Sequence, residues 1–218
     1  MTIKKTKEKR SIELRNLHTA EGSMHIEGYA AVFDSPVVLW KHEGKEYKET
    51  IARTAFDGTD MSDCCLKYNH SDSVPVLARV RGSSLKLSID DKGLKFEADL
   101  FNTTAARDVY ELIKQGGLDK CSFAFTVAED NYDKISRLRT ITKIDKLFDV
   151  SIVDIPAYND TDVSARDYFK AEAEKVKSLE NEILKKRLEL ALKLDLADFR
   201  TNSASSKKIQ DVKQTNRS

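Results

Sequence analysis

Residues 84–100 read SLKLSIDDKGLKFEADL, and this stretch decides the fold class. Apolar and polar side chains alternate on both sides of the segment DDKG at residues 90–93, whose residue types are typical of a tight turn. Alternation with a period of two places one set of side chains on each face of a strand. The stretch therefore predicts an antiparallel β-hairpin with one buried face.

The surrounding sequence extends this pattern to a whole domain. Residues 24–33 (MHIEGYAAVF), 121–127 (CSFAFTV) and 146–153 (KLFDVSIV) are rich in strand-forming residues and predict further strands. Thr103 is a candidate N-cap for a helix over residues 104–115, which two glycines end. We expect an α+β fold whose core is mainly an antiparallel β-sheet or β-barrel, with few helices.

Composition divides the chain into a folded domain and polar ends. Residues 1–10 are basic, and we expect a flexible N-terminus there, followed by a domain at residues 11–168. Residues 169–200 are rich in Lys, Glu, Leu and Ala, with an apolar residue every three to four positions, and predict a charged helix. Residues 201–218 are polar and are expected to form a flexible tail.

The composition also excludes several classes of function. The 37 Lys and Arg nearly balance the 36 Asp and Glu, which argues against a protein whose whole surface binds nucleic acid. The chain has no apolar run of about 18 residues, and residues 1–10 lack the apolar stretch of a secretion signal, so we expect a cytoplasmic protein. Neither a zinc-binding nor a phosphate-binding motif is present, and we expect no cofactor. The cysteines lack CxxC spacing and are interpreted as reduced thiols; they are Cys64, Cys65 and Cys121.

Three polar residues in or next to predicted strands are candidates for catalysis. His70 follows a short strand that delivers it to the rim of a sheet, and Ser122 shares a strand face with the small Ala124. Asp149 interrupts an apolar strand, where a carboxylate needs an imidazole or cationic partner. Together they would supply a nucleophile, a general base and an orienting group. Each residue taken alone is more readily an ordinary turn, surface or paired residue.

Other candidates have simpler interpretations. His18, His25 and His42 are interpreted as solvated surface side chains. Cys121 or the Cys64-Cys65 pair is an alternative nucleophile, although a cysteine beside an aromatic strand residue is usually a small buried hydrophobic group.

The segments also occur in a recognisable order. In this order they resemble the prohead (capsid maturation) protease family of tailed bacteriophages, whose fold is related to that of the herpesvirus assembly proteases. The resemblance covers roughly residues 12–166. It rests on IEGYAAVF at residues 26–33, KETI at 48–51, TAF at 54–56, YNH at 68–70, LAR at 77–79, CSFAF at 121–125 and LFDVSIVDIPAY at 147–158.

This resemblance implies a serine endopeptidase with Ser122 as the nucleophile and His70 as the general base. Asp149 takes the place of the third member, and Arg79 is a possible contact for the oxyanion or the substrate. Backbone N–H groups near Ser122 are the alternative oxyanion donors.

Two residues depart from the pattern of the family. Ala124 stands where glycine is usual, and Asp149 stands where glutamate is usual. An aspartate reaches about 1.5 Å less far than a glutamate, which weakens the expected contact with His70. Asp145 is the nearest substitute for the third member.

The resemblance further implies the partners and the place of action. The substrates would be the major capsid protein precursor with its scaffold segment and the protease itself, inside an assembling prohead in the host bacterial cytoplasm. We expect self-cleavage after Arg166 and a homo-oligomer, and neither a membrane nor a specific nucleic acid as partner. One alternative is a catalytically inactive protease-like scaffold or capsid-assembly protein that self-associates through the helical tail. The other is a hydrolase that uses Cys121.

Overall fold

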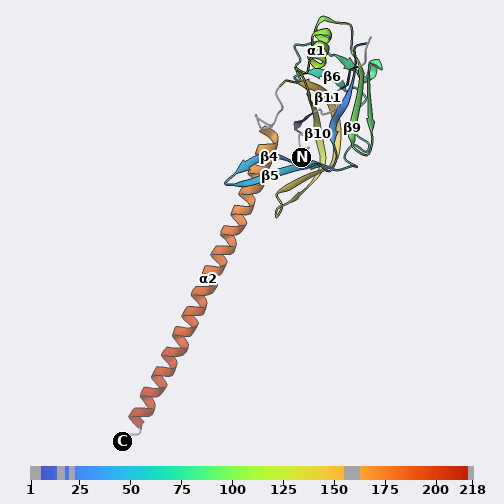
Figure 1. Cartoon of the computed structure of the whole chain (residues 1–218). Helices are drawn as coiled ribbons and strands as arrows, with labels where there is room; N and C mark the ends of the chain where they lie inside the picture. Colours follow the sequence, from blue (N-terminus) through green and yellow to red (C-terminus); the bar gives the residue numbers. More distant parts are fainter. Residues whose placement is uncertain (1–5, 14–17, 20–22, 155–162, 216–218) are drawn as a thin grey trace. The chain divides into compact units, whose positions relative to one another are not determined.

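The chain folds as two units, of which the first contains all of the strands that the structure describes. Contacts within the chain separate residues 1–169 from residues 170–218. In the first unit the strands form two sheets (Figure 1). The computed structural model describes residues 6–13, 18–19, 23–154 and 163–215.

The larger sheet is built around one long strand, β11 (Leu138–Val153). Its neighbour β10 (Lys120–Asp133) is antiparallel, and six consecutive residues of β10 are buried, so both faces of that strand are covered. The start of β11 pairs in parallel with β5, and its end pairs in parallel with β6. The main path is β1-β10-β11-β5-β4, and β7 extends the sheet beyond β6. The other strands are β1 (Lys7–Glu13), β4 (Val37–His42), β5 (Lys45–Ile51), β6 (Cys65–Tyr68) and β7 (Ala78–Arg79).

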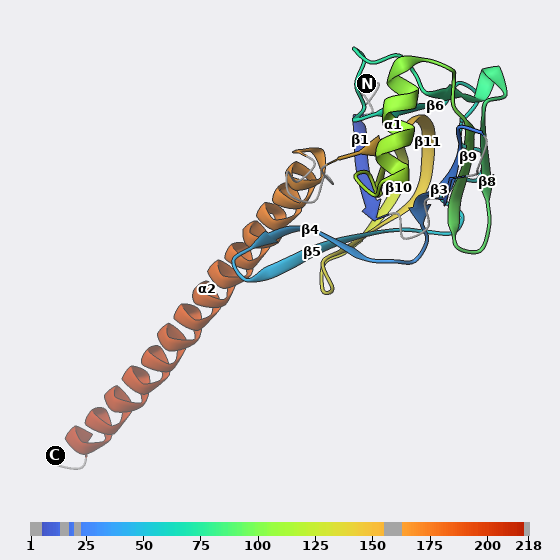
Figure 2. The ribbon, with the colours of Figure 1, turned by 45° about the horizontal axis from the view of Figure 1, so that its top comes forward.

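The smaller sheet contains the hairpin predicted from residues 84–100. Its order is β2-β3-β9-β8, and the β8–β9 hairpin pairs Leu85 with Ala98 and Ile89 with Leu94. This pairing confirms the prediction. Figure 2 shows β3, β9 and β8 side by side, and also the β4–β5 hairpin, which extends away from the rest of the β-domain. The strands are β2 (His18–Thr19), β3 (His25–Val32), β8 (Leu85–Ile89) and β9 (Gly93–Asp99).

The two sheets do not close into a barrel within the described ranges of the chain. β1 and β4 end the main path of the larger sheet, and β2 and β8 end the smaller one. The α+β class with a mainly antiparallel sheet is therefore confirmed, whereas the expected barrel is not found. Alternation shows which side chains share a face, but closure depends on strand tilt and stagger, which alternation does not encode.

One apolar core lies between the sheets and includes the first helix. β3 packs against β10 and β1, and α1 (Thr104–Lys114) contributes four buried side chains. The side chain of Thr103 accepts a hydrogen bond of 3.2 Å from the backbone N–H of Ala106, and Gly116 has a φ of 75° just after the helix. Both helix ends are those that the sequence predicts.

Residues 7–10 belong to β1, which corrects the expectation of a flexible basic N-terminus there. Glu8 and Arg10 point into the protein and are 8% and 6% exposed. Arg10 bonds to Glu8 and to Glu49 at 2.5 Å each, and Arg139 bonds to both carboxylates at 2.9 and 3.0 Å. Composition alone suggested solvated charges, but these two acids and two bases neutralise one another within the sheet.

The second helix, α2 (Val163–Thr215), is longer than the helix predicted at residues 169–200. The sequence predicts a flexible polar tail at residues 201–218, and in the structure α2 continues through this segment as far as Thr215 (Figure 1). This segment contains neither glycine nor proline, and its Ala, Lys, Gln and Ser are compatible with a helix. In the described part of the chain, no helix has the length and apolar composition needed to cross a membrane.

Candidate active site

β10 and β11 place four residues on one face of the larger sheet. Ser122 lies opposite Ser151, and Ala124 lies opposite Asp149. Opposite residues of an antiparallel pair share a face, as do residues two positions apart on one strand. The pairing therefore brings Ser122 and Asp149 to the same face.

A turn after β6 carries His70 onto this face. β6 ends at Tyr68, and the next two residues, Asn69 and His70, have left-handed backbones with φ of 52° and 53°. The backbone N–H of Asn69 donates to the carbonyl of Ile152 at 2.9 Å, and that of His70 donates to Ser151 Oγ at 3.2 Å. These two bonds to β11 hold a turn that residues other than glycine rarely adopt, and they fix the position of the imidazole.

The His70 imidazole bridges the other two candidate residues. Its Nε2 lies 2.6 Å from Ser122 Oγ, and its Nδ1 lies 2.5 Å from Asp149 Oδ1. Because Nδ1–H donates to the carboxylate, Nε2 is left to accept the proton of the Ser122 hydroxyl. The structure thus brings together all three residues that the sequence singled out, in the geometry of a serine nucleophile, a base and an orienting acid.

The Asp149 carboxylate has partners on both oxygens. Ser151 Oγ donates to Oδ1 at 2.9 Å, and Lys7 Nζ, which comes from β1, lies 3.1 Å from Oδ2. Burial raises the pKa of Asp149, but the hydrogen bond and charge of His70, the charge of Lys7 and the hydrogen bond of Ser151 outweigh it and lower the pKa to about 2. Asp149 is therefore an anion at neutral pH and can stabilise a protonated His70.

These side chains are shielded from water. Ser122 is 1% exposed, and the side chains of His70 and Asp149 are 8% and 2% exposed. Charge interactions are stronger in such a setting than in water.

A comparison with known families assigns the chain to one of them. A family model described as caudovirus prohead serine protease matches residues 10–178 of the chain. The chain belongs to the caudovirus prohead serine protease family. Membership confirms the resemblance stated from the sequence and indicates a serine peptidase of phage capsid maturation. No curated protein and no solved structure matches the chain. Of the segments that carry the resemblance, residues 155–158 lie outside the described residues.

Two other residues considered for this prohead protease site lie elsewhere. Arg79 belongs to β7, three strands from β10, or about 14 Å at the usual strand spacing. Its guanidinium instead pairs with Asp63, with Nε 2.8 Å from Oδ1. Asp145 is exposed, whereas Asp149 lies beside His70. The structure therefore brings neither Arg79 nor Asp145 to the candidate nucleophile.

The cysteines show no feature of an activated thiol. Cys64, Cys65 and Cys121 are free and buried. Burial raises the pKa of all three thiols, so the reactive thiolate is disfavoured. Their interpretation as small buried hydrophobic residues is confirmed.

The remaining histidines lie apart from this face. His25 Nδ1 contacts Asp99 Oδ1 at 2.7 Å, and its side chain is 30% exposed. His42 is 50% exposed and stacks on Trp40, with 4.8 Å between ring centroids. The side chain of His18 lies outside the described residues.

Sequence reasoning missed two residues that contact Asp149. Ser151 follows it by two positions on the same strand, so alternation alone could have placed both on one face. No sequence pattern connected Lys7 with Asp149, because Lys7 lies in a segment that was expected to be flexible.

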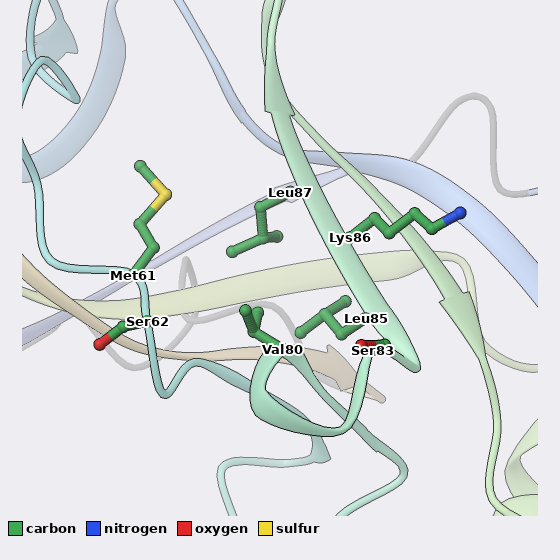
Figure 3. A pocket seen from close by; sticks show the side chains of 7 residues that line it. All are labelled: Met61, Ser62, Val80, Ser83, Leu85, Lys86 and Leu87. Atoms are coloured by element: carbon green, nitrogen blue, oxygen red, sulfur yellow. The ribbon is translucent and has the colours of Figure 1, made fainter.

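A separate pocket lies between the loop at Met61 and β8 (Figure 3). Its lining includes none of Ser122, His70 and Asp149, and it contains no pair of side chains that could act as acid and base. Its walls are mainly apolar, so it does not compete with the Ser122 face as a candidate for prohead protease chemistry. The lining residues are Met61, Ser62, Val80, Ser83, Leu85, Lys86 and Leu87.

Proposed function

We propose that this protein is a serine endopeptidase that cleaves the scaffold segment of the phage capsid precursor, and itself, inside the assembling prohead in the host cytoplasm. The observation that carries the proposal is the contact of His70 Nε2 with Ser122 Oγ at 2.6 Å, with Nδ1 bound to Asp149. Family membership supports the same reaction class.

Acylation begins when His70 Nε2 takes the hydroxyl proton as Ser122 Oγ attacks the carbonyl carbon of the scissile peptide. Nε2 then gives this proton to the leaving nitrogen, and the C–N bond breaks. Asp149 remains ionised and holds the imidazolium in place. The product of this step is an ester of Ser122 with the N-terminal part of the substrate.

Deacylation repeats the sequence with water. Nε2 removes a proton from a water molecule, whose oxygen attacks the ester carbon. Ser122 Oγ leaves and regains the proton from His70. Backbone N–H groups near Ser122 are the candidate donors to the oxyanion in both steps.

Purified capsid precursor tests the role of Ser122. We expect Ser122→Ala to lower the cleavage rate at least about a thousandfold, because the attacking oxygen is lost. Cys121→Ala is the matched control, because Cys121 precedes Ser122 on β10 and points to the opposite face; it should retain wild-type activity within a few-fold. Cleavage by Ser122→Ala would remove the assignment, and loss in Cys121→Ala alone would indicate cysteine chemistry.

Self-cleavage is proposed for α2, after Arg166. Ala165 and Phe169 are fully buried, whereas most of the described side chains between Lys170 and Leu194 are exposed, so the peptide bonds just beyond Phe169 are the more accessible ones. Mass spectrometry of the wild-type and Ser122→Ala proteins provides the test. Wild-type protein should lose a C-terminal segment that Ser122→Ala keeps, and identical C-termini would contradict self-cleavage.

The inactive scaffold remains the second candidate because of the surface of α2. Among the side chains of this helix that the structure describes, seven large apolar ones are 49–60% exposed, which is typical of a helix that associates with another chain. Cleavage should therefore be assayed over a range of protein concentrations, since association depends on concentration. Absence of wild-type cleavage at every concentration would favour the scaffold. The exposed residues are Leu179, Ile183, Leu184, Leu188, Leu190, Leu192 and Leu194.

A further inference from the structure

Lys7 reaches the Asp149 carboxylate from a different strand than the other partners of that group. β1 pairs with β10 so that Lys7 lies opposite Thr126, and its side chain extends past β10 toward β11. Its Nζ lies 3.1 Å from Asp149 Oδ2 and 4.9 Å from the ring centroid of Phe148. The lysine therefore contacts the one carboxylate oxygen that His70 leaves available.

The two carboxylate oxygens have separate roles. His70 Nδ1 and Ser151 Oγ both contact Oδ1, and Lys7 contacts Oδ2. A carboxylate held at both oxygens cannot rotate about its Cβ–Cγ bond without breaking a contact. The carboxylate therefore holds Nδ1 of His70 in a fixed direction, and the opposite ring nitrogen, Nε2, stays directed at Ser122.

The neighbouring residues of β1 fix Lys7 in place. Glu8 and Arg10 are buried in the ion-pair network with Glu49 and Arg139, so β1 is anchored immediately beside Lys7. The lysine side chain itself is 43% exposed, which leaves room for substitution without a cavity in the core.

We propose that Lys7 is a positioning residue of the active site, whose ammonium group holds Asp149 Oδ2 and thereby orients His70, so that the N-terminal strand is part of the catalytic apparatus. This inference rests on the proposed function. It also goes beyond the family assignment, because Lys7 precedes the matched residues 10–178.

The electrostatic surroundings of Asp149 define the expected effect of removing Lys7. Lys7 is one of the groups that lower the pKa of Asp149, so its loss should raise that pKa. The other titratable groups that interact with Asp149 come from the residue just before β6, from β6 itself, from the turn after it and from β10. They are His70, Cys64, Cys65, Lys67, Asp72 and Cys121.

Steady-state kinetics on the full chain test the positioning role. We expect Lys7→Met to lower kcat about tenfold with KM unchanged, and Lys7→Arg to restore most of kcat. The control is Lys114→Met, a change of the same type at an exposed position at the end of α1, which should leave kcat within about twofold. An unchanged kcat in Lys7→Met, or an equal loss in Lys114→Met, would overturn the proposal.

A spectroscopic titration separates this proposal from the proposed function. In the Ser122→Ala background, which prevents self-cleavage, the ¹³C carboxyl resonance of Asp149 should titrate at higher pH with Lys7→Met than with Lys114→Met. Lys7→Arg should titrate like the parent. If the protein cleaves no substrate, this shift still reports the contact. If cleavage depends on Ser122 but the titration is the same in all variants, the role of Lys7 is refuted while the peptidase stands.

Discussion

Asp149 shows why the length of a side chain is a poor guide to its reach in a fold. An aspartate is about 1.5 Å shorter than the glutamate usual in the family, which put its contact with His70 in doubt. In the structure the carboxylate lies 2.5 Å from Nδ1, because the turn after β6 is bonded to β11 and brings the imidazole to it. The position of the backbone in this turn therefore compensates for the shorter side chain of Asp149.

Replacing Asp149 with asparagine tests its orienting role. We expect Asp149→Asn to lower kcat by about a thousandfold or more, because an amide no longer favours the tautomer that accepts the Ser122 proton. Asp145→Asn is the control from the same strand, and its exposed position predicts little change in kcat. Both rates come from capsid-precursor cleavage. A larger loss in Asp145→Asn would transfer the role to that residue.

At the scale of elements, the glycine that ends the β8–β9 turn also determines how closely β9 approaches β3. Asp90 Oδ1 accepts hydrogen bonds from the backbone N–H groups of Lys92 and Gly93 at 2.8 and 3.0 Å, as expected for an aspartate in a tight turn. A Cβ atom on Gly93 would lie 2.0 Å from the carbonyl oxygen of Ala31 in β3. Glycine is needed at this position for close backbone approach, which the turn motif alone did not reveal.

Substitution of this glycine should destabilise the fold. We expect Gly93→Ala to lower the free energy of unfolding by about 3 kcal/mol, because the backbone of β3 must move. Gly44→Ala is the control: Gly44 has a φ of 73°, but a Cβ atom added there would meet no atom within 4 Å, so only backbone strain of about 1 kcal/mol is expected. Urea denaturation measures both. Equal losses of unfolding free energy in the two variants would show that β3 moves away from the new Cβ atom without a loss of stability.

At the scale of the whole molecule, charge is separated along the chain although the formal sum is +1. Residues 1–10 contain five basic residues and one acidic residue, and residues 169–218 contain 12 basic and eight acidic residues. The β-domain between them is therefore acidic. Loss of the basic segment 169–218 by self-cleavage would make the net charge of the remaining protein negative.

The stability of the whole molecule should depend on the ionisation of Asp149. Its pKa is about 2 in the folded protein, below the ordinary value of 3.8, so its stabilising effect is complete above about pH 4 and is lost as the pH falls toward 2. We expect wild type to lose about 1 kcal/mol more than Asp149→Asn between about pH 5 and pH 3. Urea denaturation over this pH range measures the difference. Parallel curves for the two proteins would contradict the prediction.

Local patterns account for the elements that the sequence predicted correctly. Alternation identified the β8–β9 hairpin, the capping residue Thr103 located the start of α1, and the order of motifs singled out Ser122, His70 and Asp149. The same patterns did not reveal that the sheets stay open or that residues 7–10 form a strand. Closure depends on how strands tilt and stagger, and the burial of Glu8 and Arg10 depends on partners in β5 and β11.

The sequence by itself determined the class of fold and the main strands, because turn chemistry and periodicity act over a few neighbouring residues. It indicated the residues that carry the proposed chemistry through the order of motifs that resembles the family. Only the tertiary structure decided that these residues meet. His70 and Ser122 are 52 residues apart in the chain, and Lys7 and Asp149 are 142 apart. Contacts over such separations are set by strand pairing and register, and no local pattern encodes them.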